Sequence, residues 1–333
     1  MGAAGDRAAG RAEAAPPITS SYPCRVDLTA GQPTARQDDI AIRIEGLVKD
    51  YGSVQAVRGI DLEVRRGEVF GFLGPNGAGK TTTIRCLLDL LRPTAGHLAV
   101  LGLDPRRDAV ALRRRVAYMP GELRLPERMT GAGLVAAIGH LRGGSDVRRR
   151  DDLAARLDLD LTRRLRDLSS GNRRKVALLL AFLADAELLI LDEPTNGLDP
   201  LMQREFLTLV REARQRGTTI FLSSHVLSEV QRAADRVAVL RQGSLLAVGD
   251  VEELRRRARQ RVEVWFAGPT PIDELATLSG LVEQHVDNHH FTAVLAGSVE
   301  PLLALLAAHH VVSLLVEEPD LEEAFLDLYE AAS

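Results

Sequence analysis

The chain has 333 residues, of which 45% are apolar and 26% are charged, and its formal net charge is −4. At about 150 residues per domain, this length predicts two domains, and the composition excludes collagen, coiled coil and wholesale disorder. The slightly acidic balance provides no global field that would draw the chain to nucleic acid or to an anionic membrane. Two cysteines, Cys24 and Cys86, are too few for a disulfide framework, which fits a reducing cytoplasm.

The N-terminal third is predicted to change from an unstructured extension to alternating strands and helices. Residues 1–38 are rich in Ala, Gly, Pro, Arg and Ser without periodicity, so we expect a disordered extension. Alternating apolar residues predict strands at Ile40–Ile44 and Ile60–Val64. The apolar run Glu68–Leu73 predicts a strand that ends in a glycine-rich loop, and Thr81–Leu91 predicts the helix that follows.

The middle of the chain is predicted to complete one α/β domain. Residues 122–165 are helical in pattern and rich in arginine, and apolar strands return at Leu188–Leu191, Thr218–Leu222 and Val237–Leu240. Each of these strands follows a helical stretch. Strands that alternate with helices predict a parallel sheet covered on both faces.

After Asp250 the periodicity changes, which indicates a second domain over residues 251–333. The predicted elements are a strand at Arg261–Phe266, a helix at Ile272–Leu278, a hairpin at Val282–Leu295, a helix at Val299–Ala308, a strand at Val311–Glu317 and a helix at Leu321–Tyr329. Their β-α-β-β-α-β order predicts a small ferredoxin-like domain.

No segment has the roughly 20 apolar residues of a transmembrane helix. The best candidate, residues 302–316, is shorter and carries His309 and His310 in its middle. If the protein acts at a membrane, we expect another chain to span it.

The strongest chemical motif lies between the strand at 68–73 and the helix at 81–91. It has the pattern G-x-x-x-x-G-K-T, and the residues expected to bind phosphate are Gly74, Pro75, Asn76, Gly77, Ala78, Gly79, Lys80, Thr81 and Thr82. Glycine amides can point at a phosphate without obstruction, and the helix N-terminus adds positive potential. We expect Lys80 to reach the β- and γ-phosphates and Thr81 to ligate Mg²⁺. An accidental glycine turn is disfavoured, because lysine occurs only at positions 49, 80 and 175.

A second motif is the pair of carboxylates, Asp192 and Glu193, at the end of the buried strand at 188–191. Two such groups are costly to bury unless a cation balances them. Successive strand side chains point to opposite faces, so we expect Asp192 to reach the metal and Glu193 to accept a proton from water. A solvated acid pair is the plainer alternative, but beside the phosphate loop the two motifs together indicate a P-loop nucleotide triphosphatase.

A third motif, Leu168-Ser169-Ser170-Gly171-Asn172 before a helix, resembles the signature of ATP-binding cassette (ABC) ATPases. Residues 40–250 are similar to that family in the order and spacing of their motifs. The resemblance implies an α/β P-loop NTPase fold over residues 39–250, with a RecA-like parallel core, an antiparallel β subdomain and a helical subdomain at 122–165. It also leaves room for a small α+β domain at the C-terminus.

The resemblance further implies site residues, cofactors and partners. Tyr51 looks like the aromatic residue that stacks on adenine, Asp199 like the D-loop aspartate at a dimer interface, and His225 like the switch histidine that contacts the γ-phosphate. Ser169 and Gly171 would contact ATP held by a second copy, so ATP and Mg²⁺ would join a homodimer.

Two departures from the family pattern stand out. The signature has Ser170 and Asn172 where glycine and glutamine are usual, which we expect to cause only modest tuning. Where the Q-loop glutamine belongs, the chain has Gly121 followed by Glu122, and whether Glu122 replaces the glutamine is left open.

The leading hypothesis is the nucleotide-binding subunit of an ABC transporter, which lies at the cytoplasmic face of the membrane through separately encoded permease subunits. Residues 317–329 resemble the tail of exporter-type ATPases, which favours export of drugs, antibiotics or lipid-like molecules. The rival is a soluble ABC ATPase that acts on ribosomes or DNA, but the chain has a single cassette and no visible coiled-coil or zinc insertion. A catalytically dead cassette conflicts with intact Lys80, Asp192, Glu193 and His225.

Two residue patterns have plainer readings. The arginine runs at 113–115, 148–150 and 255–257 fit solvated helix faces better than a nucleic-acid site, because no aromatic residue is interleaved. The histidine pairs at 289–290 and 309–310 lack the spaced acids or cysteines that a metal site needs.

Overall fold

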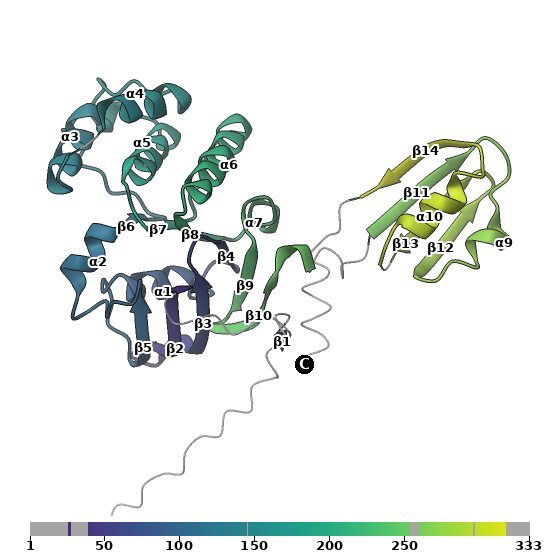
Figure 1. The fold of residues 1–333 in the computed structure, drawn as a ribbon, viewed down its shortest axis with the longest axis horizontal. Coiled ribbons are helices and arrows are strands. Elements are labelled where there is room, and N and C mark those ends of the chain that lie inside the picture. Colours follow the sequence, from purple (N-terminus) through teal and green to yellow (C-terminus); the bar gives the residue numbers. More distant parts are fainter. Residues whose placement is uncertain (1–25, 28–38, 145, 254–259, 296, 318–333) are drawn as a thin grey trace, which may run out of the picture.

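The computed structural model describes residues 26–27, 39–144, 146–253, 260–295 and 297–317. Most of the predicted extension, the arginine run at 255–257 and the predicted helix at 321–329 lie outside the described residues. Within the described ranges the strands form three sheets (Figure 1).

The central sheet has the strand order β1-β10-β9-β4-β8-β7-β6. Its strands are β1 (Val26–Asp27), β4 (Val69–Leu73), β6 (Val116–Met119), β7 (Leu188–Asp192), β8 (Thr219–Ser224), β9 (Arg236–Arg241) and β10 (Ser244–Asp250). The neighbours from β9 to β6 are parallel, as the alternation of strands and helices predicts, whereas β10 pairs antiparallel with β9. Strand β10 completes a tight hairpin with β9 that the sequence analysis did not identify.

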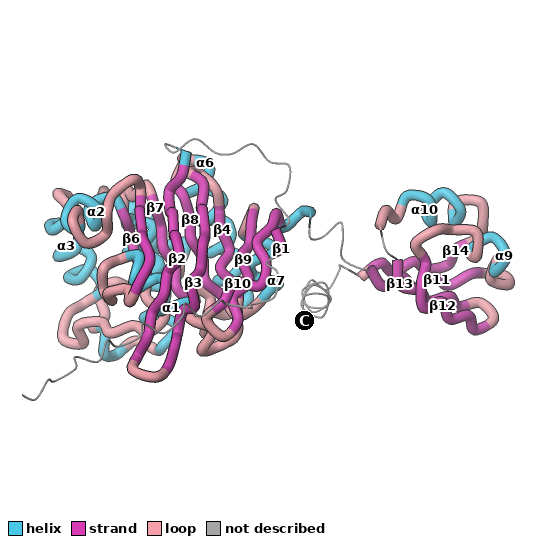
Figure 2. The backbone as a smooth tube through the Cα atoms, turned by 90° about the horizontal axis from the view of Figure 1, so that it is seen from below, coloured by secondary structure: helices cyan, strands magenta, loops and turns pink. Residues whose placement is uncertain are grey.

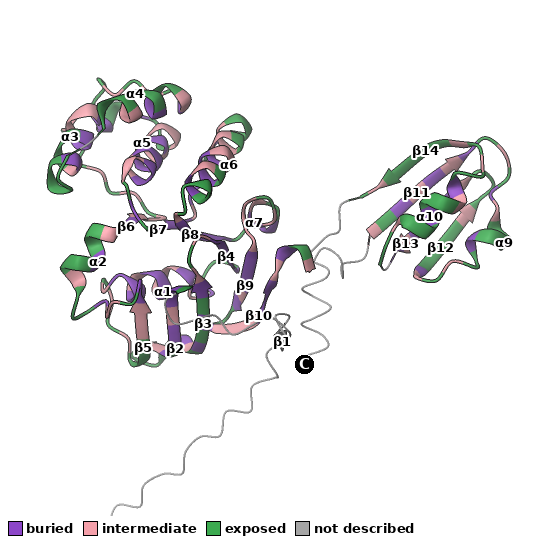
Figure 3. Ribbon diagram, viewed as in Figure 1, coloured by how far each residue is buried: buried purple, intermediate pink, exposed green. Residues whose placement is uncertain are grey.

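The two faces of the central sheet belong to two separate cores. In β7, Leu188 and Ile190 join one core and Leu189 and Leu191 the other, as the two-residue period of a strand requires. Helix α1 (Lys80–Leu87) covers the first face, and helices α5 (Ser170–Leu183) and α6 (Pro200–Gln215) cover the second. The buried sides of α5 and α6 are visible in Figure 3.

A second, antiparallel sheet lies beside α1 and has the order β3-β2-β5 (Figure 2). Its strands are β2 (Ile40–Tyr51), β3 (Val54–Arg65) and β5 (Ala95–Val100). Strands β2 and β3 form one long hairpin, so they extend beyond the short alternating runs from which they were predicted.

The helical segment is composed of α3 (Gly131–Leu141), α4 (Val147–Arg156) and the short 3-10 helix Leu165–Asp167. Residues 122–130 contain no helix, so the helical segment begins later than predicted. Two further helices lie along this part of the chain: α2 (Ala109–Arg115) leads into β6, and α7 (Leu227–Ala233) lies between β8 and β9.

The C-terminal elements have the predicted β-α-β-β-α-β order. They are β11 (Gln260–Phe266), α9 (Ile272–Leu275), β12 (Leu281–Asp287), β13 (His290–Leu295), α10 (Glu300–Leu306) and β14 (Val311–Val316). The strands form an antiparallel sheet in the order β12-β13-β11-β14, around a core of its own that includes Val264, Phe291 and Leu302. The ferredoxin-like expectation therefore agrees with both the element order and the sheet order.

One expectation about the N-terminal segment needs correction. Val26 and Asp27 form β1 and pair in parallel with Ala247 and Val248, so regular structure begins before Ile40. A strand of two residues is too short to leave a periodic pattern in the sequence. Among the described residues, none of the helices has the length and apolar character needed to cross a membrane.

Candidate functional site

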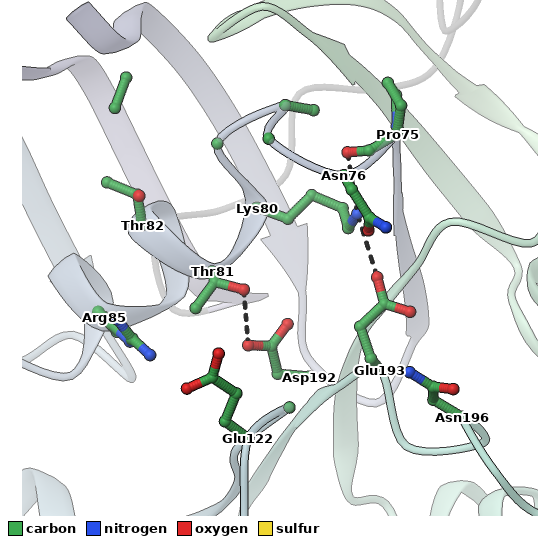
Figure 4. Close-up of a pocket in the computed structure, with 15 residues that line it drawn as sticks. Pro75, Asn76, Lys80, Thr81, Thr82, Arg85, Glu122, Asp192, Glu193 and Asn196 are labelled. Atoms are coloured by element: carbon green, nitrogen blue, oxygen red, sulfur yellow. Dashed lines mark hydrogen bonds and ion pairs between the residues drawn. The ribbon is translucent and has the colours of Figure 1, made fainter. Parts of the chain in front are cut away.

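A cavity of about 380 Å³ lies where the loop after β4, the end of β7 and the segment after β6 meet (Figure 4). It is lined by Ala56, Pro75, Asn76, Gly77, Ala78, Gly79, Lys80, Thr81, Thr82, Arg85, Gly121, Glu122, Asp192, Glu193 and Asn196. The cavity therefore unites the predicted phosphate loop, both predicted carboxylates and the residues at the Q-loop position. It lies outside the carboxyl ends of parallel strands, where open α/β sheets bind ligands.

The phosphate loop requires glycine at several of its positions. Gly79 has a φ of 108° and caps α1, and a Cβ there would lie 2.6 Å from the Ala56 carbonyl oxygen. At Gly74 a Cβ would lie 2.2 Å from the carbonyl oxygen of Leu240. Both contacts are with backbone and cannot relax cheaply, so a side chain at either position would deform the loop.

Only 5% of Lys80 is exposed. Its ammonium contacts three groups at the base of the loop. Its Nζ donates to the carbonyl oxygen of Gly74 at 2.6 Å and to that of Pro75 at 3.3 Å. It also forms an ion pair with Glu193 Oε1 at 3.1 Å. A buried cation with these partners is held at the position from which it can meet phosphate oxygens.

Thr81 and Asp192 place hard oxygen atoms side by side. The Thr81 hydroxyl donates to Asp192 Oδ2 at 2.9 Å, and the buried Ser223 hydroxyl donates to Asp192 Oδ1 at 2.5 Å. Hydroxyl and carboxylate oxygens are the ligands that Mg²⁺ prefers. The donor set of Thr81 and Asp192 therefore fits a magnesium ion.

Glu193 follows β7 in a left-handed conformation with a φ of 51°. Its amide donates to the Ser223 carbonyl oxygen at 3.1 Å, which fixes the turn. Its Oε1 faces Lys80, and its Oε2 lies 2.6 Å from Nδ1 of His225. A bulky residue at positive φ is uncommon and typically marks a functional position.

Gly121 and Glu122 line the cavity next to Asp192. A Cβ at Gly121 would be 3.4 Å from Asp192 Oδ2, which is ordinary contact, and the Glu122 side chain points into the cavity (Figure 4). In the preceding strand, burial and the Asp192 charge raise the pKa of Tyr118 to about 12, so its phenol stays neutral.

The remaining predicted residues do not line this cavity. Ser169 and Asp199 are the N-caps of α5 and α6, and their side chains accept from the amides of Asn172 and Met202. Tyr51, at the end of β2, is 47% exposed, and Lys49 Nζ lies 5.1 Å from its ring centre. Gly171, in the first turn of α5, is likewise absent from the lining.

Sequence reasoning missed three residues that the structure brings to the site: Arg85, Arg174 and Ser223. Arg85 lines the cavity, Ser223 binds Asp192, and Arg174 donates to backbone carbonyls of Gly121 and Glu193. Ser223 precedes His225, the expected switch histidine, by two positions, which is the only sequence signal for it. Nothing in the run Arg173-Arg174-Lys175 distinguishes Arg174 from its neighbours.

Comparison with known proteins places this geometry in a family. A family model described as ABC transporter matches residues 57–196. The daunorubicin resistance ATP-binding protein DrrA3 of Streptomyces coeruleorubidus is 36% identical over 303 residues, which are 87% of this chain and 96% of that protein. The bacitracin transport ATP-binding protein BcrA of Bacillus licheniformis is 33% identical, over 75% of this chain and 81% of that protein.

Solved structures agree with the fold. The structure of an ATP-binding subunit of an ABC transporter has a TM-score of 0.61 and 30% identity, and it covers 65% of this chain and 92% of its own. A dimeric post-hydrolysis ATP-binding cassette bound to ADP and Pi has a TM-score of 0.58 and 18% identity, and it covers 63% of this chain and 98% of its own.

Proposed function

This chain belongs to the ATP-binding subunits of ABC transporters, and from that premise we propose that two copies hydrolyse ATP between them to power a separate membrane permease that exports drugs or antibiotics. The observation that carries the proposal is the meeting of Lys80, Thr81, Asp192 and Glu193 in one cavity below the glycine loop. The drug and antibiotic resistance proteins among its relatives support the direction and the class of cargo.

ATP is bound through its phosphates. Loop amides such as those of Gly77 and Gly79 and the N-terminus of α1 bind the anion, whereas the amides of Gly74 and Ala78 donate to the carbonyl oxygens of Ser224 and Pro75. Lys80 neutralises the β- and γ-phosphates. Thr82 continues the first turn of α1 and completes this cradle. The exposed ring of Tyr51 stacks on adenine, for which an accessible aromatic face is suited.

Thr81 and Asp192 would hold Mg²⁺, which when bound neutralises charge on the phosphates. Ser223 fixes the Asp192 carboxylate from the side opposite Thr81. The ligand oxygens are therefore oriented by the protein rather than by the ion alone.

Glu193 is the general base. It accepts a proton from a water molecule as the water oxygen bonds to the γ-phosphorus, and the bond from that phosphorus to the β–γ bridging oxygen breaks, which yields ADP and phosphate. His225, 2.6 Å from Glu193, orients the carboxylate and is close enough to contact the γ-phosphate.

A second copy completes each site. Ser169 and Gly171 lie at the N-terminus of α5, and Asp199 at that of α6, outside the cavity that holds Lys80. Helix N-termini bind anions, so Ser169 and Gly171 contact ATP held by the other copy, and Asp199 lies at the interface between the copies. ATP then joins the two copies and hydrolysis separates them, a two-state switch that a permease can follow.

The test is capture of the partner with an ATP-trapped chain. A tagged Glu193→Gln chain is recovered from native membranes in mild detergent with ATP, and Lys80→Ala serves as the control that cannot form the ATP-bound dimer. A polytopic membrane protein in stoichiometric amount with Glu193→Gln supports the proposal. Recovery of ribosomes or DNA-repair proteins without a membrane chain overturns it.

A further inference from the structure

The guanidinium of Arg174 joins two segments of the active site from the side of the signature helix. Arg174 lies in α5, one turn after Gly171. Its Nη2 donates to the Gly121 carbonyl oxygen at 2.8 Å, and its Nη1 donates to the Glu193 carbonyl oxygen. One planar group thus fixes both the segment after β6 and the turn that carries the general base.

The two acceptors are backbone groups at positions where the chain is unusual. Glu193 has a φ of 51°, so its carbonyl leaves the line of β7; it accepts from the Asn196 amide at 3.3 Å and from Arg174. Gly121 has no side chain to fix the loop, and Arg174 supplies that anchor. Burial lowers the pKa of Arg174 and the nearby charges of Glu193 and Asp192 oppose that shift, so the fork stays charged at neutral pH.

We propose that Arg174 is a positioning residue: when the signature of its copy contacts the ATP held by the second copy, Arg174 positions Glu193, the general base of its own copy. This inference rests on the proposed function. Ser169, Gly171 and Arg174 occupy the first turns of one helix and move as a rigid rod. Ser169 and Gly171 face the ATP held by the second copy, whereas Arg174 holds Glu193 of its own copy. A shift of α5 on closure of the dimer therefore moves the Glu193 carbonyl and the Gly121 loop together.

The neighbouring arginine provides a matched control. Arg173 Nε donates to the Leu168 carbonyl oxygen at 3.1 Å, and its Nη2 to that of Arg166 at 3.5 Å. Both acceptors lie in the segment just before α5 and neither is part of the cavity. Loss of Arg173 removes a similar number of hydrogen bonds without touching Gly121 or Glu193.

The experiment measures ATPase rate against ATP concentration for full-length wild type, Arg174→Met, Arg174→Lys and Arg173→Met, with the Tm of each. We expect Arg174→Met to lower kcat about tenfold, to change the half-saturating ATP concentration less than twofold, and to bring the Hill coefficient toward one. Arg174→Lys should recover part of kcat, because an ammonium can still donate to these carbonyls. Arg173→Met should match wild type.

The proposal is overturned if Arg174→Met matches Arg173→Met, or if its loss of kcat comes with no change in the Hill coefficient. If Arg174→Met lowers the Tm by more than about 5 °C, Arg174→Gln, which keeps an amide donor, is used in its place. That variant must then show both the lower kcat and the Hill coefficient nearer one. A wild-type chain without ATPase activity would instead remove the proposed function itself, so the two failures are distinguishable.

Discussion

Nδ1 of His225 lies 2.6 Å from Oε2 of Glu193, while the other oxygen of the same carboxylate lies 3.1 Å from Lys80 Nζ. Both neighbours of this carboxylate are groups that a γ-phosphate attracts. In the proposed mechanism a γ-phosphate would compete with Glu193 for Lys80, while His225 keeps its contact with Oε2, so binding would leave Oε1 to water. The contact thus links occupation of the cavity to exposure of the base.

Replacement of Glu193 by Gln should lower the ATPase rate by about 10²- to 10⁴-fold, because the amide has the same shape but cannot accept the proton. ATP affinity should fall less than threefold, and an ATP-bound dimer should accumulate in size-exclusion chromatography. Glu45→Gln, an exposed change on β2, is the control. Turnover within fivefold of wild type would remove Glu193 from the role of base.

A site shared between two copies predicts complementation between two inactive variants. Lys80→Ala lacks phosphate binding and Ser169→Arg blocks the signature, so each homodimer should be inactive. In a mixed dimer, one site combines both defects and the other combines the intact phosphate loop of one copy with the intact signature of the other. The mixed dimer has one working site of two, so once purified it should recover up to about half of the wild-type rate, and less to the extent that Arg174 couples the two sites.

The mixture is prepared by coexpression with two different tags, and the doubly tagged dimer is purified before its ATPase rate is measured. A mixture as inactive as its parents would mean that Ser169 serves the ATP of its own copy. A chain carrying both substitutions, mixed with wild type, is the control: such dimers retain one defective phosphate loop and one defective signature at different sites, so neither site is intact.

Sequence patterns were sufficient where a residue acts through its own chemistry at a strand end. The run from Glu68 to Thr81 combines a buried strand, a glycine loop and a helix N-terminus, and few folds satisfy all three. Asp192 and Glu193 come directly after four apolar residues, 188–191, so no other side chain of that run could supply a polar group to the site. These positions were predicted because local structure and chemistry agree there.

The contacts that hold those residues in place were not predictable, because they depend on tertiary geometry. Arg174 acts through the direction of a backbone carbonyl, and the positive φ of Glu193 that turns this carbonyl has no signal in the sequence. Likewise β1 pairs with β10 through two residues, which carry no period. Such features follow from the packed fold rather than from local preference.

A buried ion pair in the central sheet predicts a stability cycle. Glu68 and Arg236 are each 8% exposed and lie 3.0 Å apart. Arg236→Met should lower the free energy of unfolding by about 3–5 kcal/mol, since it removes the guanidinium that balances a buried carboxylate, and the double variant with Glu68→Met should recover most of that loss. Arg214→Met, which removes the exposed partner of half-buried Asp235, should cost less than about 1 kcal/mol.

The same pair has a pH dependence whose sign follows from burial. Burial raises the pKa of Glu68, against the opposing charge of Arg236, so between the unfolded and the folded pKa the folded state binds more protons than the unfolded state. The contribution of Glu68 to the free energy of unfolding is complete below its pKa in the unfolded state, and it declines as the pH rises through its pKa in the folded state. The loss in Arg236→Met should therefore be smaller at pH 5 than at pH 7.5 in urea unfolding, and an equal loss at both would contradict this origin.

Cys86 predicts a decline of stability on the alkaline side. Its residue is 1% exposed, in α1, and burial raises the pKa of its thiol to about 11. Because the folded chain keeps the proton that an unfolded thiol loses near pH 8.5, stability should fall as the pH rises from about 8.5 toward 11.

In a Cys24→Ser background, which leaves Cys86 as the only thiol, native protein at pH 8 should resist a disulfide reagent and react fully in urea. Cys86→Ala should flatten the slope of unfolding free energy between pH 8 and pH 10, and rapid labelling of the native thiol at pH 8 would show that α1 does not protect it.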